Sequence, residues 1–141
     1  MTPAVGDAVP EFRVTAVSAE KMKIIALILR DPNPIHFDLD AVAAAGLGDR
    51  EVNQGGLNLG YVLDALVAWA GRRDAVQAID CRFAANVFAG DDVVVGGTVT
   101  AVRAAEGEQG QHLVDCEVWA DRGDGVRAIS GRATVAFVAS A

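Results

Sequence analysis

The sequence is poor in cysteine, aromatic side chains and positive charge, and each shortage excludes a class of protein. Two cysteines among 141 residues are too few for a disulfide framework or a zinc cluster. Lys and Arg number 12 against 19 Asp and Glu, so the net charge of −7 offers no electrostatic footprint for nucleic acid. The longest apolar run, Ile24–Leu29, is far short of the roughly 20 residues that cross a bilayer. Without a signal peptide at its start, the chain is expected to be cytoplasmic, with no membrane contact.

What the sequence does contain is a large share of small apolar residues. Hydrophobic residues make up 52% of the chain, while aromatic residues make up only 6% and glycines number 15. At about 100–200 residues per domain, residues 1–141 are expected to form a single domain. Much of the apolar content is Ala and Val, which lets a helix lie directly against a sheet. Cys81 and Cys116 alternate in phase with apolar neighbours, which predicts buried, reduced thiols.

The first half of the chain has helical character. Ser18 is an N-cap candidate for a helix over residues 19–30, which must end at the two prolines of the Asp31–Pro34 segment. Asp38 can cap a short helix over residues 39–45, closed by glycines. These elements are expected to precede a longer helix.

That longer helix is predicted over residues 57–70, which are apolar on nearly every face. Such a helix belongs in the middle of a protein. Asp64 lies inside it, where an unpaired carboxylate is costly, so we expect Asp64 to pair with an arginine such as Arg82 or to face a partner protomer.

From residue 76 onward the pattern is that of strands. Four long alternating or Val-rich segments and an opening extended segment predict an antiparallel five-stranded sheet, curled around the helix in an α+β fold. Its exposed edges favour pairing with a second copy. Gly96 and Gly97 indicate a bulge or a close approach of the helix. The predicted strands cover residues 6–17, 76–87, 92–104, 112–122 and 126–139.

The candidate site lies between the first two helices. Asp31 and His36 flank a loop that Pro32 and Pro34 stiffen, and Asn33 can fold its side chain back onto the backbone. A carboxylate and an imidazole held at a fixed separation can bind one water between them as base and acid. His112, at the start of a strand, is expected on the surface.

Residues 31–38 resemble the D-x-N-P-[IL]-H-x-D motif of the MaoC-like (R)-specific enoyl-CoA hydratases, a branch of the hot-dog-fold proteins. Residues 81–92, from Cys81 to Asp92, are similar to a second segment of that family, R-F-x-x-P-V-x-x-G-D. The resemblance runs from about residue 18 to the last strand. It implies a single hot-dog domain, with the five-stranded sheet wrapped around one long central helix and short helices before it.

The resemblance also implies an activity that needs no cofactor and no metal. Asp31 and His36 would hold the water that adds to a trans-2-enoyl thioester, or release it from an (R)-3-hydroxyacyl thioester. Gly55 corresponds to the family glycine whose backbone amide supports the thioester oxygen, which suits a helix N-terminus. The expected catalytic residues are therefore Asp31, His36 and Gly55.

The chain departs from the family pattern at the turn before the central helix. Gln54 stands where the family has histidine, Gly56 where it has a bulky apolar residue, and Gly60 where it has a small hydroxyl residue. Either the glycines admit a bulky or unusual acyl group, which is the favoured interpretation, or activity is altered and the site only binds. The expected substrate-binding residues are Asn33, Gln54, Gly56, Asn58 and Tyr61.

Two alternative functions stay open at this point: a hot-dog acyl thioesterase, and a non-catalytic or half-site subunit of a hetero-oligomer. The expected partner is an acyl thioester, with coenzyme A favoured over an acidic acyl carrier protein because the chain itself is acidic. A homodimer or a dimer of dimers is expected. Candidate partners for the coenzyme A phosphates are Lys21, Lys23, Arg72, Arg73 and Arg82.

Overall fold

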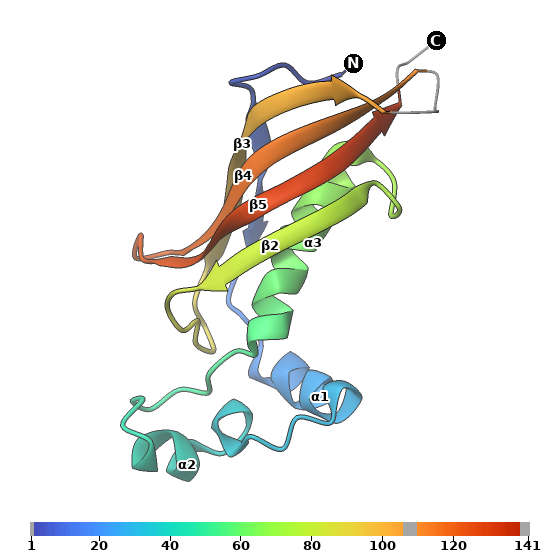
Figure 1. Ribbon diagram of the computed structural model, residues 1–141. Coiled ribbons are helices and arrows are strands. Elements are labelled where there is room, and N and C mark those ends of the chain that lie inside the picture. Colours follow the sequence, from blue (N-terminus) through green and yellow to red (C-terminus); the bar gives the residue numbers. More distant parts are fainter. Residues whose placement is uncertain (1, 106–109, 139–141) are drawn as a thin grey trace.

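The computed structural model describes residues 2–105 and 110–138. Five strands form one antiparallel sheet in the order β1-β3-β4-β5-β2, and helices lie on its concave side and below one end (Figure 1). The strands are β1 (Ala8–Val14), β2 (Val76–Phe83), β3 (Val93–Ala104), β4 (Gln111–Arg122) and β5 (Arg127–Val138). The helices are α1 (Ala19–Leu29), the 3-10 turn η1 (Pro34–His36), α2 (Leu39–Ala44) and α3 (Gly55–Ala70).

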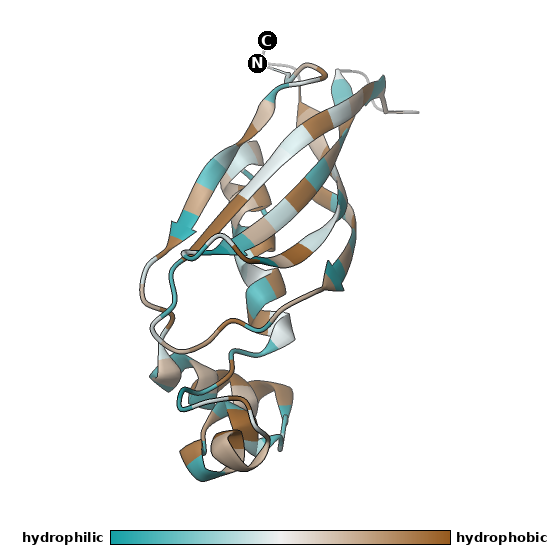
Figure 2. Ribbon diagram, turned by 90° about the vertical axis from the view of Figure 1, so that its left-hand side faces the viewer, coloured by the Kyte–Doolittle hydropathy of each residue, from teal (hydrophilic) through white to brown (hydrophobic). Residues whose placement is uncertain are grey.

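The sheet curves around α3, as the view from the side makes plain (Figure 2). Strands β3, β4 and β5 follow one another as hairpins, whereas β2, which leaves α3, pairs with β5 at the edge opposite β1. This arrangement confirms the expected α+β hot-dog fold. The predicted elements differ from the observed ones mainly at their ends: α3 begins two residues early, at Gly55, and β2 ends at Phe83 rather than at residue 87. The predicted end of β5, Ala139, lies outside the described residues.

The prediction that the central helix is buried on all sides is wrong for this chain alone. Asn58, Val62 and Leu66 lie on the face of α3 that is buried, while Gly56 and Asp64 are exposed on other faces. One sheet covers one side of a helix, so an apolar helix needs a second cover to be fully buried. Among the described residues Asp64 forms no ion pair, and the expected pairing with Arg82 is absent.

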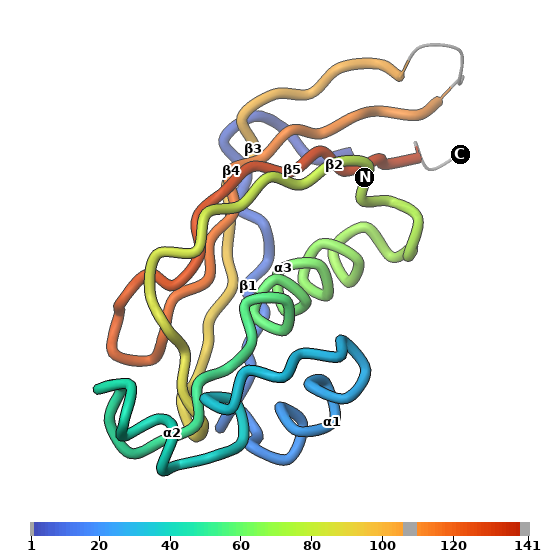
Figure 3. Tube along the Cα trace, turned by 60° about the horizontal axis from the view of Figure 1, so that its bottom comes forward, coloured from blue at the N-terminus to red at the C-terminus, as the bar shows by residue number. Residues whose placement is uncertain are grey.

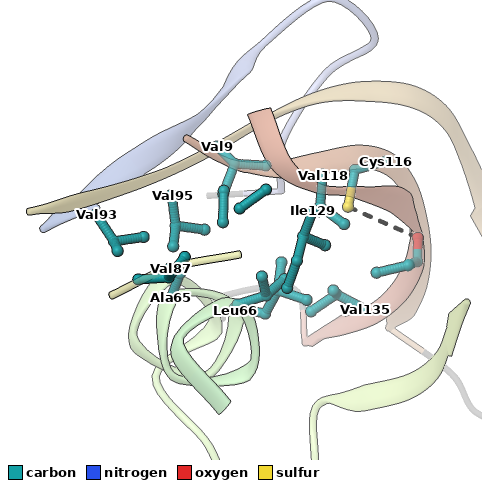
Figure 4. Packing of buried hydrophobic residues seen from close by; sticks show 14 of the residues in the cluster. Val9, Ala65, Leu66, Val87, Val93, Val95, Cys116, Val118, Ile129 and Val135 are labelled. Carbon is teal, nitrogen blue, oxygen red and sulfur yellow. Dashed lines mark hydrogen bonds between the residues drawn. The ribbon is translucent and has the colours of Figure 1, made fainter. Parts of the chain in front are cut away.

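The core between α3 and the sheet consists largely of valines from the strands and of Val62, Ala65 and Leu66 from the helix (Figure 4). Leu66 and Ile129 are its largest aliphatic side chains on the two facing layers, each 1% exposed or less. Burying a side chain of this kind contributes about 1.5–3 kcal/mol relative to exposure. The strand residues labelled there with Ile129 are Val9, Val93, Val95, Cys116, Val118 and Val135.

Gly96 and Gly97 do allow a close approach, and the atoms nearest to them belong to the neighbouring strands. A Cβ at Gly96 would lie 2.9 Å from Trp119 Nε1, and one at Gly97 would lie 2.5 Å from the carbonyl oxygen of Glu117. Both contacts come from β4, and Val9 of β1 adds a third at 2.8 Å. The glycines therefore permit tight strand-to-strand packing. The bulge that was expected as one alternative is present, because the register of β1 against β3 shifts between Val9, which pairs with Gly97, and Phe12, which pairs with Val95.

Helices α1 and α2 and the turn η1 lie beside the N-terminal end of α3 (Figure 3). Ser18 caps α1 as predicted, by accepting a hydrogen bond from the Lys21 amide, and Asp38 caps α2. Met22 and Ala26 of α1 are buried and Ile25 is half-buried, whereas four other large apolar side chains face outward: Ile24, Leu27, Ile28 and Leu29 are 55–80% exposed. In the ranges 2–105 and 110–138, none of the helices combines the length and the apolar character needed to cross a bilayer.

The two thiols differ in burial, and we expect them to differ in reactivity. Cys116 is 1% exposed and its burial raises its pKa to about 11, whereas Cys81 is half-buried and burial raises its pKa by less. The thiolate is the nucleophile, and at pH 8 only about one Cys116 side chain in a thousand is deprotonated to this form. Iodoacetamide at pH 8 should modify Cys81 first and leave Cys116 intact in the native protein, as read by peptide mass spectrometry. Equal rates for both thiols would contradict this assignment.

Candidate active site

The loop between α1 and η1 is built to hold Asp31 in place. Helix α1 is capped at its C-terminus by Arg30, which adopts the left-handed conformation with φ of 52°, and the Asp31 amide donates to the carbonyl of Ala26 at 2.9 Å. The Asn33 amide donates to Asp31 Oδ1 at 3.1 Å, and the Asn33 side chain caps η1 by accepting from the Ile35 amide. The predicted local role of Asn33 is thus confirmed, and one carboxylate oxygen of Asp31 is anchored to the loop.

The other oxygen of that carboxylate faces the imidazole of His36. Asp31 Oδ2 lies 3.2 Å from His36 Nε2, and the imidazole itself is buried, with 7% of the residue exposed. On the far side of the ring, His36 Nδ1 donates to the backbone carbonyl of Val52 at 2.6 Å. A carbonyl oxygen only accepts, so this bond assigns a proton to Nδ1 and leaves Nε2, which faces Asp31, as the ring nitrogen that can accept a proton from a molecule beside it. The predicted pair is therefore assembled, in a geometry suited to acid–base chemistry.

The N-terminus of α3 supplies unpaired backbone donors. Gln54 precedes the helix without capping it through its side chain, and its carbonyl accepts from the amides of Leu57 and Asn58 at 3.0 Å. Within the described part of the chain, the amides of Gly55 and Gly56 have no acceptor. Unpaired amides at a helix N-terminus favour negative charge. This turn can therefore stabilise an oxygen that gains charge during a reaction.

The three glycines of this turn and helix differ in the space around them. A Cβ at Gly55 would lie 3.3 Å from the ring of Phe83, which is tight, and one at Gly56 would be in ordinary contact with Leu29 at 3.6 Å. Nothing lies within 4 Å of the corresponding position at Gly60. The extra space that a glycine was expected to leave is present at Gly60. Phe83 occupies part of the space next to Gly55, and Leu29 occupies part of the space next to Gly56.

Gln54, which was predicted to bind substrate, is buried, and its side-chain amide is held by α1. Its side chain is 2% exposed, and Nε2 donates to the carbonyl of Met22 in α1 at 2.8 Å. Gln54 thus ties α1 to the start of α3. Its Oε1 atom is buried without a partner in the described residues.

Asn58 and Tyr61 belong to a polar cluster whose centre, Asn53, we did not predict. Asn53 is 3% exposed, and its Nδ2 donates to Asn58 Oδ1 at 2.6 Å and to the Tyr61 hydroxyl at 3.3 Å. Burial raises the pKa of Tyr61, and the hydrogen bond from Asn53 partly opposes that rise. The signal in the sequence was a pair of consecutive amides, Asn53 and Gln54, just before the glycine turn. We refer to Asn53, Asn58 and Tyr61 as the amide–tyrosine cluster.

A pocket of about 660 Å³ opens beside Asp31, between α1 and the loop. Its lining is mostly apolar, with Leu27 and Phe37 among the lining residues. Lys23 and Arg30 add positive charge; Lys23 is paired with Glu20, and Arg30 makes no ion pair with another described residue. Of the predicted phosphate partners Lys23 is here, whereas Arg72 binds Asp74 elsewhere. In residues 2–105 and 110–138, no group of three or more His, Cys, Asp or Glu side chains is placed to hold a metal.

Hydrogen bonds of the Val52 backbone connect the two groups of predicted site residues. Asp31, Asn33 and His36 lie in the loop, and Gln54, Gly55, Gly56, Asn58 and Tyr61 lie at or near the start of α3. The Val52 amide donates to the carbonyl of Ile35 and its carbonyl accepts from His36, so the segment before α3 is fastened to η1 on both sides. This contact holds the acid–base pair and the amide donors of Gly55 and Gly56 in one fixed frame.

Solved structures of other proteins share the fold of this chain. The (R)-hydratase of A. caviae involved in PHA biosynthesis superposes with a TM-score of 0.81 at 21% identity, covering 97% of this chain and 98% of that one. A chain of the ChsH1-ChsH2 complex of Mycobacterium tuberculosis gives 0.79 at 24% identity, covering 96% and 99%. A MaoC-like dehydratase from Rhodospirillum rubrum gives 0.79 at 21% identity, covering 99% and 95%. No curated protein sequence matches this chain.

At these identities the structural likeness establishes the hot-dog fold alone. The sequence itself adds a more specific finding, because residues 3–119 match the model of the MaoC-like domain. That range holds both Asp31 and His36, the Gly55–Gly56 turn and the whole of α3. The chain is therefore a member of the MaoC-like domain family.

Proposed function

We propose that this protein is a hydro-lyase that adds water reversibly to trans-2-enoyl thioesters and removes it from (R)-3-hydroxyacyl thioesters. The observation that carries the proposal is the buried His36, whose Nδ1 is bound to Val52 and whose Nε2 faces Asp31 at 3.2 Å. An imidazole held in one tautomer beside a carboxylate is suited to taking a proton from water and returning one to carbon. Membership of the MaoC-like family and the likeness to an (R)-hydratase add support.

In the proposed reaction, Asp31 and His36 hold one water between them. The pair accepts a proton from that water while its oxygen bonds to C3 of the enoyl thioester. The electron pair of the C2=C3 bond moves toward the thioester oxygen, which gains charge opposite the Gly55 amide. The pair then gives a proton to C2 on the same face, and dehydration follows these steps in reverse.

The test is hydration of crotonyl-CoA and a panel of bulkier enoyl-CoAs, followed by the loss of enoyl-thioester absorbance. We expect turnover of at least one member of the panel, with the (R)-3-hydroxyacyl product resolved by chiral chromatography. A thioesterase would instead release free thiol and leave the double bond in place. Thiol release without loss of absorbance would reject the hydro-lyase proposal.

A second candidate, a subunit that needs a partner to complete its site, is favoured by one observation. The face of α3 turned away from the core is exposed at Gly56, Asp64 and Ala68, although the helix is apolar. We propose that a second protomer, identical or related, covers this region. Sedimentation should give a dimer or a larger assembly, and activity that appears only in a mixture with a second chain would identify a half-site subunit.

For the carrier, we propose coenzyme A, recognised at the positive rim of the pocket beside Asp31. Arg30 is exposed, lines the pocket and has no ion-pair partner among the described residues, so its guanidinium is available to a phosphate. Arg30→Gln should raise KM for an enoyl-CoA about tenfold, in keeping with the loss of one charge-assisted hydrogen bond. The same enoyl group on pantetheine, which lacks the nucleotide, should show no such rise. An equal rise in KM for both substrates would place the role of Arg30 elsewhere.

A further inference from the structure

The amide–tyrosine cluster is unusual because two of its members, Asn58 and Tyr61, bring polar groups to the side of α3 that packs against the core. Asn58 precedes Val62, Ala65 and Leu66 along the buried stripe of the helix, and only 5% of its surface is exposed. Polar side chains at such positions are nearly always fully hydrogen-bonded. The pairing within the cluster, however, accounts for only part of its hydrogen-bonding capacity.

Two hydrogen-bond donors of the cluster have no acceptor among the described residues. Asn53 Nδ2 donates to both Asn58 Oδ1 and the Tyr61 hydroxyl, so both of those oxygens serve as acceptors. Among the described residues the amide nitrogen of Asn58 and the hydroxyl proton of Tyr61 then have no acceptor. Asn53 itself is held by its backbone amide, which donates to the carbonyl of Val87 at 2.7 Å. Asn53 therefore orients its two neighbours so that both present donors.

The carbonyl oxygen of Asn53 gives a second sign that the cluster is incomplete. It is buried without a hydrogen-bond partner in the described residues. Leaving such a group unpaired costs about 1–3 kcal/mol, so a protein that keeps it commonly has a water or a ligand group nearby. An amide oxygen only accepts, so a hydroxyl that donates to it, from a water or from a ligand, would complete the cluster next to the start of α3.

We propose that Asn58 and Tyr61 bind an oxygen atom on the acyl chain of the substrate, a carbonyl or a hydroxyl that accepts their two hydrogen bonds. This inference rests on the proposed function, since it assumes that the thioester oxygen lies at the Gly55 amide. The substrate class is then the oxygenated enoyl thioesters, and a plain hydrocarbon chain is the poorer substrate. A site with buried polar groups discriminates strongly against an analogue that leaves them unpaired.

Helix geometry indicates where on the chain that oxygen lies. Asn58 and Tyr61 follow Gly55 by three and six residues, which corresponds to rises of about 4.5 and 9 Å along α3. An extended zig-zag chain advances about 1.2 Å per bond, so an acyl chain that runs beside the helix covers this span in roughly four to seven bonds from the thioester carbon. An oxygen on one of about the fifth to eighth carbons of the acyl group would meet the two donors.

Binding of two saturated acyl-CoAs of equal length tests the inference without requiring catalysis. Calorimetric titration of the whole protein with 6-oxooctanoyl-CoA should give a Kd about tenfold lower than titration with octanoyl-CoA, as expected for two added hydrogen bonds. Tyr61→Phe, which removes only the hydroxyl, and Asn58→Leu should each bring the ratio of the two Kd values closer to one. His112→Ala, at the start of β4 and outside the amide–tyrosine cluster, is the control and should keep the ratio.

The outcomes separate this inference from the proposed function. Equal Kd values for the two ligands in the unaltered protein, or a ratio that neither variant changes, would overturn the inference and leave the proposed function standing. The corresponding enoyl-CoA with the 6-oxo group then tests catalysis: a preserved binding preference without hydration would overturn the proposed function instead. A water molecule as the only occupant of the cluster corresponds to the equal-Kd result.

Discussion

Asp31→Asn should lower the rate of enoyl-CoA hydration by about a hundredfold to ten-thousandfold, the range that acid–base groups contribute. The asparagine is nearly isosteric and keeps an oxygen for the amide of Asn33, so the loop should stay folded. What it loses is the ability to accept a proton opposite His36 Nε2. Steady-state kcat and KM on the best enoyl-CoA of the panel measure the effect, which should fall on kcat.

His36→Ala should reduce the rate by a similar factor, and the double variant should be hardly worse than either single one. Groups that act on one water as a unit have non-additive effects. The natural controls are Asp49→Asn, at an exposed carboxylate, and His112→Ala, at the only other histidine. If the rate of the double variant fell by the product of the two factors measured for the single variants, Asp31 and His36 would be acting independently. That result would contradict the shared-water mechanism.

Gly131→Ala should destabilise the protein by about 1–3 kcal/mol, the usual cost of adding bulk to a packed position. Gly131 of β5 lies opposite Cys81 of β2, and an added Cβ would contact the carbonyl of Asp80 and lie 2.6 Å from Cys81 Sγ. Backbone cannot move as a flexible side chain does, so β2 would have to shift away from β5. Urea unfolding followed by circular dichroism gives the change in the free energy of unfolding.

Gly60→Ala is the matched control, since the same methyl group is added where nothing lies within 4 Å. Gly60 lies inside α3, where alanine is favoured over glycine by about 0.5–1 kcal/mol. The two substitutions should therefore change stability in opposite directions. Destabilisation by both would mean that the space beside Gly60 is needed for the fold, and stabilisation by both would contradict the tight pairing of β2 with β5.

The local chemistry of the sequence predicted the helix ends and the loop of the site well. Ser18 and Asp38 cap the helices as expected, because an N-cap depends on a side chain and on the two or three amides after it. Asp31 and His36 could be paired from sequence because two prolines limit the loop between them. These features depend on residues close together in the chain.

Features that depend on distant residues could not be predicted in the same way. Gln54 was expected to line a pocket, but its amide reaches the carbonyl of Met22, a partner 32 residues away in the sequence. The role of Gly97 depends on Glu117 and Val9, which only the sheet topology brings together. Likewise, the apolar character of α3 indicates that it needs covering on several sides, without indicating whether the cover is its own sheet or another chain.

The bond between His36 and Val52 has a consequence for how freely the sequence can diverge. The acceptor is a main-chain carbonyl, which every amino acid possesses, so a substitution at position 52 changes the side chain but not the group that binds Nδ1. Enzymes that orient a histidine with an aspartate lose the tautomer when that one side chain mutates. Here the acceptor is the main-chain carbonyl oxygen of residue 52, which every substitution of Val52 keeps. Point mutation at position 52 therefore leaves the tautomer of His36 unchanged.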